Sequence, residues 1–432
     1  MGYFDKQSHR MGELHRWLEM RKEQGADVRP LVKEIDLAVA RWIKEAEALK
    51  PEPGKYVEPN PLKDILAARP KGPRKLAYNL TDSQLQDKML GALLARCAGC
   101  VLGVPVEGRP KSFIKEWAEE LGQPYPLAEY WNAWWMGPDC GHYYDRMRDF
   151  LKPNLNHVAQ DDDTVYTVLG LVILEEAGID FSAEDVGRLW AKYLPVACTA
   201  EARALENLKA GLKPPKTALK NNPFAEWIGA DIRSDPWGYA APGLPELAAD
   251  YAYRDASVSH VLNGIYGEMF FSAAIAAAFV VDSAEEALRI ALTEIPAKSR
   301  MAESVKETMK WCRQDDDWEI TSARIDMRYQ GMHHVHTLNN AAITIMGLLY
   351  GEGDLEKTIS ITVMGGYDTD CTAATAGSIA GAILGAKQLP DKWIAPLGDR
   401  LRTYLIGAEE YSIKDVASRF CKIAKEARAK YA

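Results

Sequence analysis

Apolar residues recur three and four positions apart along most of the chain, which is the spacing of amphipathic helices. In the first 50 residues this spacing is carried by Leu14, Trp17, Leu18, Ile35, Val39, Trp42 and Ile43. Two helices are therefore predicted there. Prolines then interrupt the pattern at positions 51, 53, 59, 61, 70 and 73. Such a density of proline predicts a linker or an extended strap over about residues 50–78.

A capping signal marks the start of the next predicted helix. Thr81-Asp-Ser-Gln84 has the form of a capping box, and apolar residues continue the helix as far as Cys97. Pro105 is expected to end it, so that Glu107 projects from a turn. Cys97 and Cys100 form a CxxC pair, but no second pair follows at zinc spacing. This favours two small buried residues over a metal or redox site.

Two further runs predict buried helices. Residues 269–281 are almost wholly apolar, yet they are well short of the roughly 20 residues that a membrane-spanning helix needs. Residues 371–385 carry small and apolar side chains without a charge, which is typical of a closely packed buried helix. Residues 389–432 are expected to add closing helices, and no segment alternates convincingly between polar and apolar positions. The chain is therefore predicted to be all-α.

Composition places the chain among ordinary soluble globular proteins, because 47% of its 432 residues are apolar and 26% are charged. Its net charge of -9 argues against binding to nucleic acid or to an anionic membrane surface. The N-terminus lacks the layout of a secretion signal, and the seven cysteines are too thinly spread for a disulfide framework. We therefore expect a cytoplasmic protein.

Two acidic motifs carry the candidate chemistry. Asp368 and Asp370 open the small-residue helix, and buried carboxylates need a counter-charge or a metal ion. Gln160-Asp-Asp-Asp163 opens another apolar helix, where the acids either cap the helix or bind a cation. The same tetrapeptide recurs at residues 314–317 without a long apolar run after it, which predicts a solvated turn.

Other polar and aromatic stretches offer weaker candidates for binding a substrate. Residues 111–157 are rich in tryptophan and tyrosine, including Trp134, and either cover a substrate or fill the core. Residues 222–243 look like a polar loop that contains Asp231 and Arg233. His260 is expected in the first turn of the following helix, with either a structural or a site role. Two further groups are Lys298 to Arg300, a candidate for binding phosphate, and His333, His334 and His336, which fit no zinc signature.

Four separated stretches together resemble the ADP-ribosylglycohydrolase family, the group that includes the glycohydrolase that reactivates dinitrogenase reductase. They are Gly99 to Glu107, Asp161-Asp-Asp-Thr164, Ser259-His260 and Asp368-Thr-Asp-Cys371, within a similarity that spans about residues 84–387. The chain departs from the family pattern at four positions: Cys100 replaces an Asp, Asp161 replaces a Thr or Ser, Tyr367 is inserted after the glycines, and Cys371 replaces a Thr.

The resemblance implies an orthogonal helical bundle over residues 79–432 with two magnesium ions in a central cleft. Residues 1–78 would form an N-terminal extension that packs against the domain or forms a homo-oligomer. The implied metal ligands are Asp161, Asp162, Asp163, Asp368 and Asp370. Hard oxygen ligands suit Mg²⁺, and the extra carboxylate of Asp161 could favour Mn²⁺.

The implied reaction is hydrolysis of the C1'' bond of an ADP-ribosyl or related ribosyl substrate. Asp162 or Asp163 would orient the attacking water, and Glu107 would gate the site or assist the leaving group. The expected substrate contacts are Trp134, Asp231, Arg233 and His260. Three alternatives stay open: another N- or O-glycoside or nucleoside as substrate, a metal-free glycosidase with two carboxylates, and a non-catalytic protein that binds ADP-ribose.

Overall fold

The computed structural model describes residues 5–49, 54–137 and 142–432, and it divides into two compact units, Met1–Tyr56 and Val57–Ala432. The smaller unit contains α1 (Asp5–Glu23) and α2 (Arg29–Ala48), which confirms the two amphipathic helices expected there. The larger unit begins earlier than the boundary expected at residue 78. Its first residues are held by ion pairs to the rest of the unit, because the Glu58 carboxylate accepts from Arg300 at 2.8 Å and Arg69 donates to the buried Glu294 at 2.5 Å.

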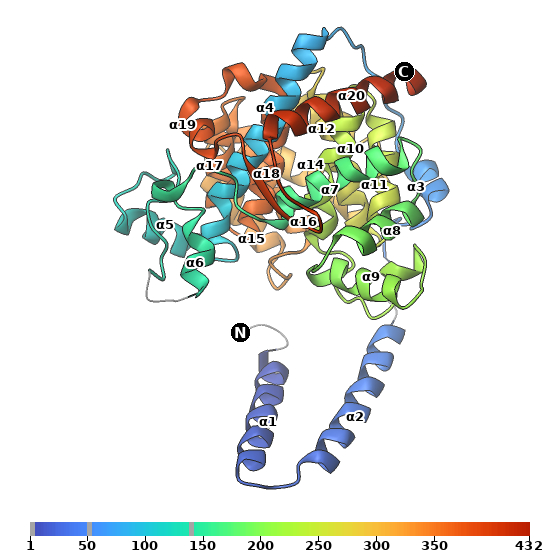
Figure 1. Cartoon of the computed structure of the whole chain (residues 1–432), viewed down its shortest axis with the longest axis vertical. Helices are drawn as coiled ribbons and strands as arrows, with labels where there is room; N and C mark the ends of the chain where they lie inside the picture. The colour runs from blue at the N-terminus through green and yellow to red at the C-terminus, as the bar shows by residue number, and fades with distance from the viewer. Residues whose placement is uncertain (1–4, 50–53, 138–141) are drawn as a thin grey trace. The chain divides into compact units, whose positions relative to one another are not determined.

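The larger unit is almost entirely helical, as predicted (Figure 1). Its first helices are α3 (Leu62–Ala68), α4 (Asp82–Gly103), α5 (Lys111–Glu120), α6 (His142–Arg148), α7 (Asp162–Ala177), α8 (Ala183–Tyr193), α9 (Thr199–Lys209), α10 (Asp235–Ala240) and α11 (Pro245–Ala256). They are followed by α12 (Asn263–Ala278), α13 (Ala284–Ala291), α14 (Arg300–Gln314), α15 (Trp318–Arg328), α16 (Thr337–Gly351), α17 (Leu355–Met364), α18 (Thr369–Leu384), α19 (Asp391–Ile394) and α20 (Ile413–Tyr431).

Helices α4 and α18 pack along one another through small residues at the centre of the larger unit (Figure 1). A Cβ atom added at Gly99 would overlap the carbonyl group of Ala373, and one added at Gly381 would overlap the carbonyl oxygen of Gly91. The two backbones therefore approach more closely than larger side chains allow. This confirms the closely packed helix expected after residue 370.

The start and the end that were predicted for α4 are confirmed. Thr81 caps the helix through the predicted capping box with Gln84. The helix ends at Gly103, and a short 3-10 helix η1 (Val104–Val106) carries the chain to the exposed Glu107. In the described part of the chain, Asp82–Val106 is the only helical stretch with the length and composition of a membrane span, and 89% of its most apolar window is buried in the protein.

Two predictions about the rest of the chain need correction. Residues 401–411 form a β-hairpin from β1 (Leu401–Leu405) and β2 (Ala408–Tyr411), where closing helices were expected. The alternating burial of β1 was visible in Leu-Arg-Thr-Tyr-Leu, but it covers only five residues. Residues 222–243, expected as a polar loop, contain η5 (Ile228–Arg233) and α10, whose residues are all buried. Residues 269–281, in contrast, lie largely in α12, which is buried throughout, as predicted.

Replacing Gly99 with alanine should destabilise the protein by about 3 kcal/mol or more, because the added methyl group has no space beside Ala373. The helix propensity of alanine would offset only about 1 kcal/mol of this loss. The free energy of unfolding in urea measures the effect. Gly12→Ala in the exposed α1 is the matched control and should not destabilise the protein, since only the end of the Arg16 side chain lies near. Equal stability of the Gly99→Ala variant and the wild type would contradict the close packing.

Candidate metal centre

The Gly-Gly-Tyr-Asp turn before α18 positions Asp368 and Asp370, and both of these acids are buried. Tyr367 lies in the left-handed region with φ of 66°, an uncommon conformation for a bulky residue. Its hydroxyl donates to Asp326 at 2.8 Å, and its carbonyl accepts from the Gly108 N–H at 2.9 Å. The backbone N–H of Asp368 donates to the Asn340 side chain at 3.0 Å. The inserted tyrosine therefore ties the turn to the segment that carries Glu107.

Two groups of acids result from this arrangement. Glu107, Asp368 and Asp370 can place one carboxylate oxygen each within 4.8 Å of one another, and Asp161, Asp162 and Asp163 do the same. Both groups therefore have the spacing of ligands that could share a metal ion.

The acids at the start of α7 cap the helix and also have the spacing of metal ligands. Asp161 is the N-cap, and its carboxylate accepts from the backbone N–H of Asp163 at 3.0 Å. The later copy of the motif forms bends before α15, where Asp316 and Asp317 are exposed and Asp317 caps the helix. The prediction that the two copies differ in burial is confirmed.

The two acidic groups lie close enough that the charges of each group raise pKa values in the other. Burial, followed by the charges of Glu107 and Asp162, raises the pKa of Asp368 to about 8. Burial, followed by the charges of Asp162 and Glu107, raises the pKa of Asp161 to about 7. Burial and the charge of Asp162 also raise the pKa of Glu107. These carboxylates disfavour their charged forms unless a cation joins them.

The side chains present fit a hard cation. Asp370 has a buried oxygen, Oδ1, without a hydrogen-bond partner in the described part of the chain. Among the described basic residues, only Arg96 forms an ion pair with an acid of either group, at 3.4 Å from Asp163. Arg96 also pairs with the buried Asp235 at 2.5 Å, so its charge is shared. Carboxylate oxygens with too little positive charge around them suit Mg²⁺ or Mn²⁺ better than a softer metal.

Cys371, which departs from the family pattern, and Thr372 beside it are both poor candidates for a metal ligand. Burial raises the pKa of the Cys371 thiol well above its usual value, which keeps it neutral. The hydroxyl of Thr372 donates to the backbone carbonyl of Asp368, four residues earlier, at 2.8 Å. Its hydrogen is therefore already used at the start of its own helix. A buried, neutral thiol is a poor ligand for Mg²⁺, which binds oxygen atoms.

A cavity of about 570 Å³ opens beside Asp161 and Asp162. Its wall includes Arg146 of α6, Cys198 before α9, and Arg402 and Tyr404 of β1. None of these four residues was identified from the sequence. Tyr404 could have been found through the alternation of β1, whereas Arg146 has no local signal because only the fold brings α6 near Asp162.

Comparison with known proteins identifies the scaffold. The sequence profile of the ADP-ribosylglycohydrolase family matches residues 81–428. The chain belongs to this family. A solved structure described as an ADP-ribosylglycohydrolase-related protein complex is similar with a TM-score of 0.53 and 19% identity, over 79% of this chain and 99% of that chain. This likeness concerns the fold, and no protein with a curated description is matched. Membership in the ADP-ribosylglycohydrolase family points to glycohydrolase activity.

Arg233, expected to contact the substrate of this glycohydrolase-family protein, lies in an internal ion network instead. Its side chain is 2% exposed, and it donates to Asp255 at 2.5 Å and to Glu201, with Glu268 at 3.5 Å. A guanidinium with these partners is not available to a substrate phosphate. The polar composition of residues 222–243 therefore reflects a buried charge network.

The other expected substrate contacts are also buried. Asp231 is 1% exposed and accepts from the Thr337 hydroxyl, while its other oxygen has no described partner. His260 precedes α12 instead of lying in its first turn, and its Nδ1 is 2.8 Å from the Ser259 hydroxyl. Trp134 is 6% exposed and packs edge-on against Trp135. None of these three residues lines the described cavity.

The two basic groups noted in the sequence have structural partners. Ser299 caps α14, and the Arg300 guanidinium contacts Glu58 at 2.8 Å and Glu226 at 2.9 Å. His333 stacks on Trp227 with ring centres 4.1 Å apart, and the His336 side chain caps α16. The His334 ring lies beside Gly108, because a Cβ added at that glycine would be 3.6 Å from its Nε2.

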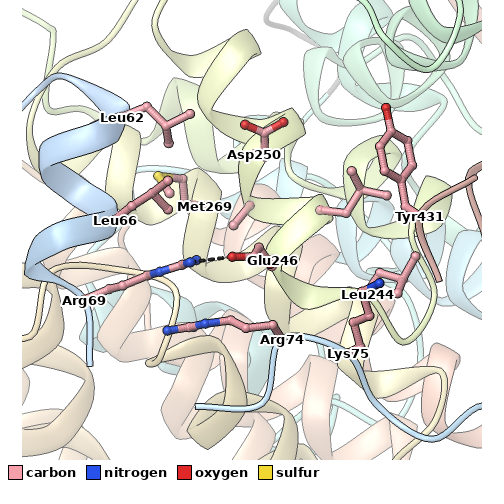
Figure 2. A pocket seen from close by; sticks show the side chains of 12 residues that line it. Leu62, Leu66, Arg69, Arg74, Lys75, Leu244, Glu246, Asp250, Met269 and Tyr431 are labelled. Atoms are coloured by element: carbon pink, nitrogen blue, oxygen red, sulfur yellow. Dashed lines mark hydrogen bonds and ion pairs between the residues drawn. The ribbon is translucent and has the colours of Figure 1, made fainter. Parts of the chain in front are cut away.

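A second cavity, of about 370 Å³, lies beside α3 and α11 (Figure 2). Its apolar side chains include Leu62, Leu66 and Met269, and Arg69 pairs with Glu246 at its edge. None of the acids of the two groups lines this cavity, so it is separate from the candidate metal centre.

The metal-free protein should lose stability as the pH rises from about 4 to 8. Asp161 and Asp368 keep protons up to about pH 7 and 8 when folded, whereas unfolded aspartate releases its proton near pH 4. The folded state therefore binds more protons in this window, and the free energy of unfolding falls with pH. Thermal melting in EDTA across this range measures the trend.

Adding Mg²⁺ or Mn²⁺ should raise the melting temperature more at pH 8 than at pH 6, because the metal competes with protons for the carboxylates. Asp368→Asn should reduce both the pH trend and the metal effect. A metal effect of equal size at both pH values would contradict the assignment of these acids as ligands.

Proposed function

We propose that this protein is a metal-dependent glycohydrolase that cleaves the C1'' glycosidic bond of an ADP-ribosyl or related ribosyl substrate. The observation that carries the proposal is that two acidic groups lie close enough to raise one another's pKa values, while only one described basic residue, Arg96, pairs with them. Family membership supports the class of reaction. Two Mg²⁺ ions, or Mn²⁺ in their place, would be held by Asp161, Asp162, Asp163, Asp368 and Asp370.

We assign the catalytic and the metal-binding roles of the acids from how exposed each side chain is. When bound, the metal ions supply positive charge that orients ribose hydroxyls and lowers the pKa of a water molecule. Asp162 is half-buried and lines the cavity, which suits it to orient the attacking water. Asp163 is 3% exposed and turned toward Arg96, so we assign it to holding the cation.

Glu107 is suited to proton transfer toward the leaving group. It is the exposed member of its acidic group, and its pKa is raised by partial burial and by Asp162. A carboxyl with a raised pKa retains a proton closer to neutral pH and can donate it. Tyr367 helps to position this acid, because its carbonyl holds the N–H of the adjacent Gly108 at 2.9 Å.

Asp162→Asn should lower the hydrolysis rate by roughly 100-fold or more with the fold retained, since it removes a charged ligand without changing size. Asp316→Asn in the second copy of the same tetrapeptide is the matched control and should keep wild-type activity, because Asp316 is exposed. Rates are measured by release of free ADP-ribose, and circular dichroism checks the fold. Equal activity of the two variants would reject the role of Asp162.

Arg146 is our candidate for the anionic part of the substrate, in place of Arg233. It lines the cavity, is exposed, and forms no ion pair with another described residue. Its charge reaches the site, since it lowers the pKa values of Asp162 and Glu107 against the effect of burial. A guanidinium in this position suits a diphosphate.

Arg146→Gln should raise KM for an ADP-ribosyl substrate by about 10-fold or more, which matches the loss of a charge-assisted hydrogen bond. The value of kcat should change little, and KM for a plain riboside should be unaffected. Arg148→Gln on the same helix is the control, because Arg148 is paired with Asp149 at 3.5 Å. An equal change in KM for both substrates would argue against a diphosphate contact.

The substrate itself is decided by a screen of ADP-ribosyl-arginine, ADP-ribosyl-serine, O-acetyl-ADP-ribose and simple ribosides. Hydrolysis of ribosides alone would move the function to another glycoside or nucleoside. Activity that survives EDTA would favour a metal-free glycosidase with two carboxylates. Binding of ADP-ribose in calorimetry, without turnover of any substrate, would favour a binding protein.

A further inference from the structure

The two N-terminal helices carry large apolar side chains that the smaller unit itself does not cover. Leu37 is 66% exposed, Trp17 is 57% exposed and Trp42 is 51% exposed. Met11, Leu31, Val32 and Ile43 are also exposed, and no residue of α2 is buried. Of the positions whose spacing predicted these helices, Trp17, Trp42 and Ile43 are exposed. The others, Leu14, Leu18, Ile35 and Val39, are half-buried, so the apolar face is only partly covered within its own unit.

The apolar positions of α2 follow a heptad pattern. Val32, Ile35, Val39, Trp42 and Ala46 follow one another in steps of three and four, and the flanking Val28 and Leu49 continue the pattern at the two caps. This repeat of 3.5 residues is typical of helices that pack along another helix in a coiled coil or a bundle. In α1 the same steps join Met11, Leu14 and Leu18.

A helical pair of this size needs further burial to be stable. Most helix stability in proteins comes from packing an apolar face, even for helices longer than the roughly 15 residues below which isolated helices are marginal in water. The helices have 19 and 20 residues, so each offers a face about 30 Å long. With a width of about 10 Å, two such faces bury roughly 600 Å² per chain, or about 1,200 Å² in a dimer, which is the lower limit for stable interfaces.

The charges of this unit favour a second copy of the same chain as the partner. Residues 5–49 carry nine basic and nine acidic side chains, so the net charge of -9 lies entirely on the rest of the protein. A neutral surface with interspersed charges of both signs does not select a strongly charged partner. It can match itself across a two-fold axis, where each basic side chain meets an acidic one.

We propose that α1 and α2 form a helical hairpin that binds the hairpin of a second copy, so that the protein is a homodimer held by a four-helix interface. The interface is isologous, with the apolar positions of α2 at its centre and the charged positions of both helices at its rim. The candidate metal centre lies within the larger unit and needs no residue from this interface.

The test is the molar mass of the full-length protein in solution, measured by light scattering and by sedimentation over a range of concentrations. The wild type should have twice the chain mass of 48.0 kDa. Trp42→Glu combined with Ile43→Glu should weaken the dimer at least about 100-fold, because four large apolar side chains per dimer lose their burial. The variant should retain the melting temperature and the hydrolytic activity of the larger unit.

Met327→Glu is the matched control, because Met327 is a 71% exposed apolar residue on α15 of the larger unit. This variant should remain a dimer. A monomeric wild type at about 100 µM would overturn the proposal and leave the hairpin as a surface for a different protein. A dimer that persists in the Trp42 and Ile43 double variant would overturn it as well, because the contact would then lie elsewhere.

Discussion

The close contact between α4 and α18 is the constraint on which the candidate site depends. Glycine and alanine on both helices allow backbone-to-backbone packing, for example where Gly99 faces Ala373 and Gly103 faces Asp370. The contact places the end of α4 beside the start of α18, and so it brings Glu107 to Asp368 and Asp370. A larger side chain anywhere along this contact would separate the acids as well as the helices.

Burying several carboxylates together makes their charged forms electrostatically unfavourable unless a cation is bound. Among the residues that the structure describes, Arg96 is the basic residue that pairs with these acids, and it divides its charge between Asp163 and Asp235. The remaining acids respond with raised pKa values, with Asp161 near 7 and Asp368 near 8. A divalent cation relieves this repulsion directly, so the same physical feature that lowers the stability of the metal-free fold provides the driving force for metal binding.

Ion pairing also distinguishes the arginine that can bind a ligand from the arginines that stabilise the fold. Arg233 and Arg300 each form ion pairs with at least two carboxylates, and these pairs stabilise the fold. Arg146 lies on the wall of the cleft without such a partner among the described residues. From the sequence these arginines look alike, because the local composition around each is polar. Only the positions of distant acids, such as Glu201 for Arg233, decide which guanidinium can meet a ligand.

The sequence by itself determined the helical class, the cap of α4 at Thr81, the burial of α12 and α18, and the acids that open α7 and α18. These features depend on periodicity and on neighbours within a few residues. Tertiary structure alone decided the convergence of the acids, the enclosure of Arg233 and the contribution of Tyr404 to the cleft. Each of these joins residues far apart in the chain, and their contact is set by how helices pack and not by local propensity.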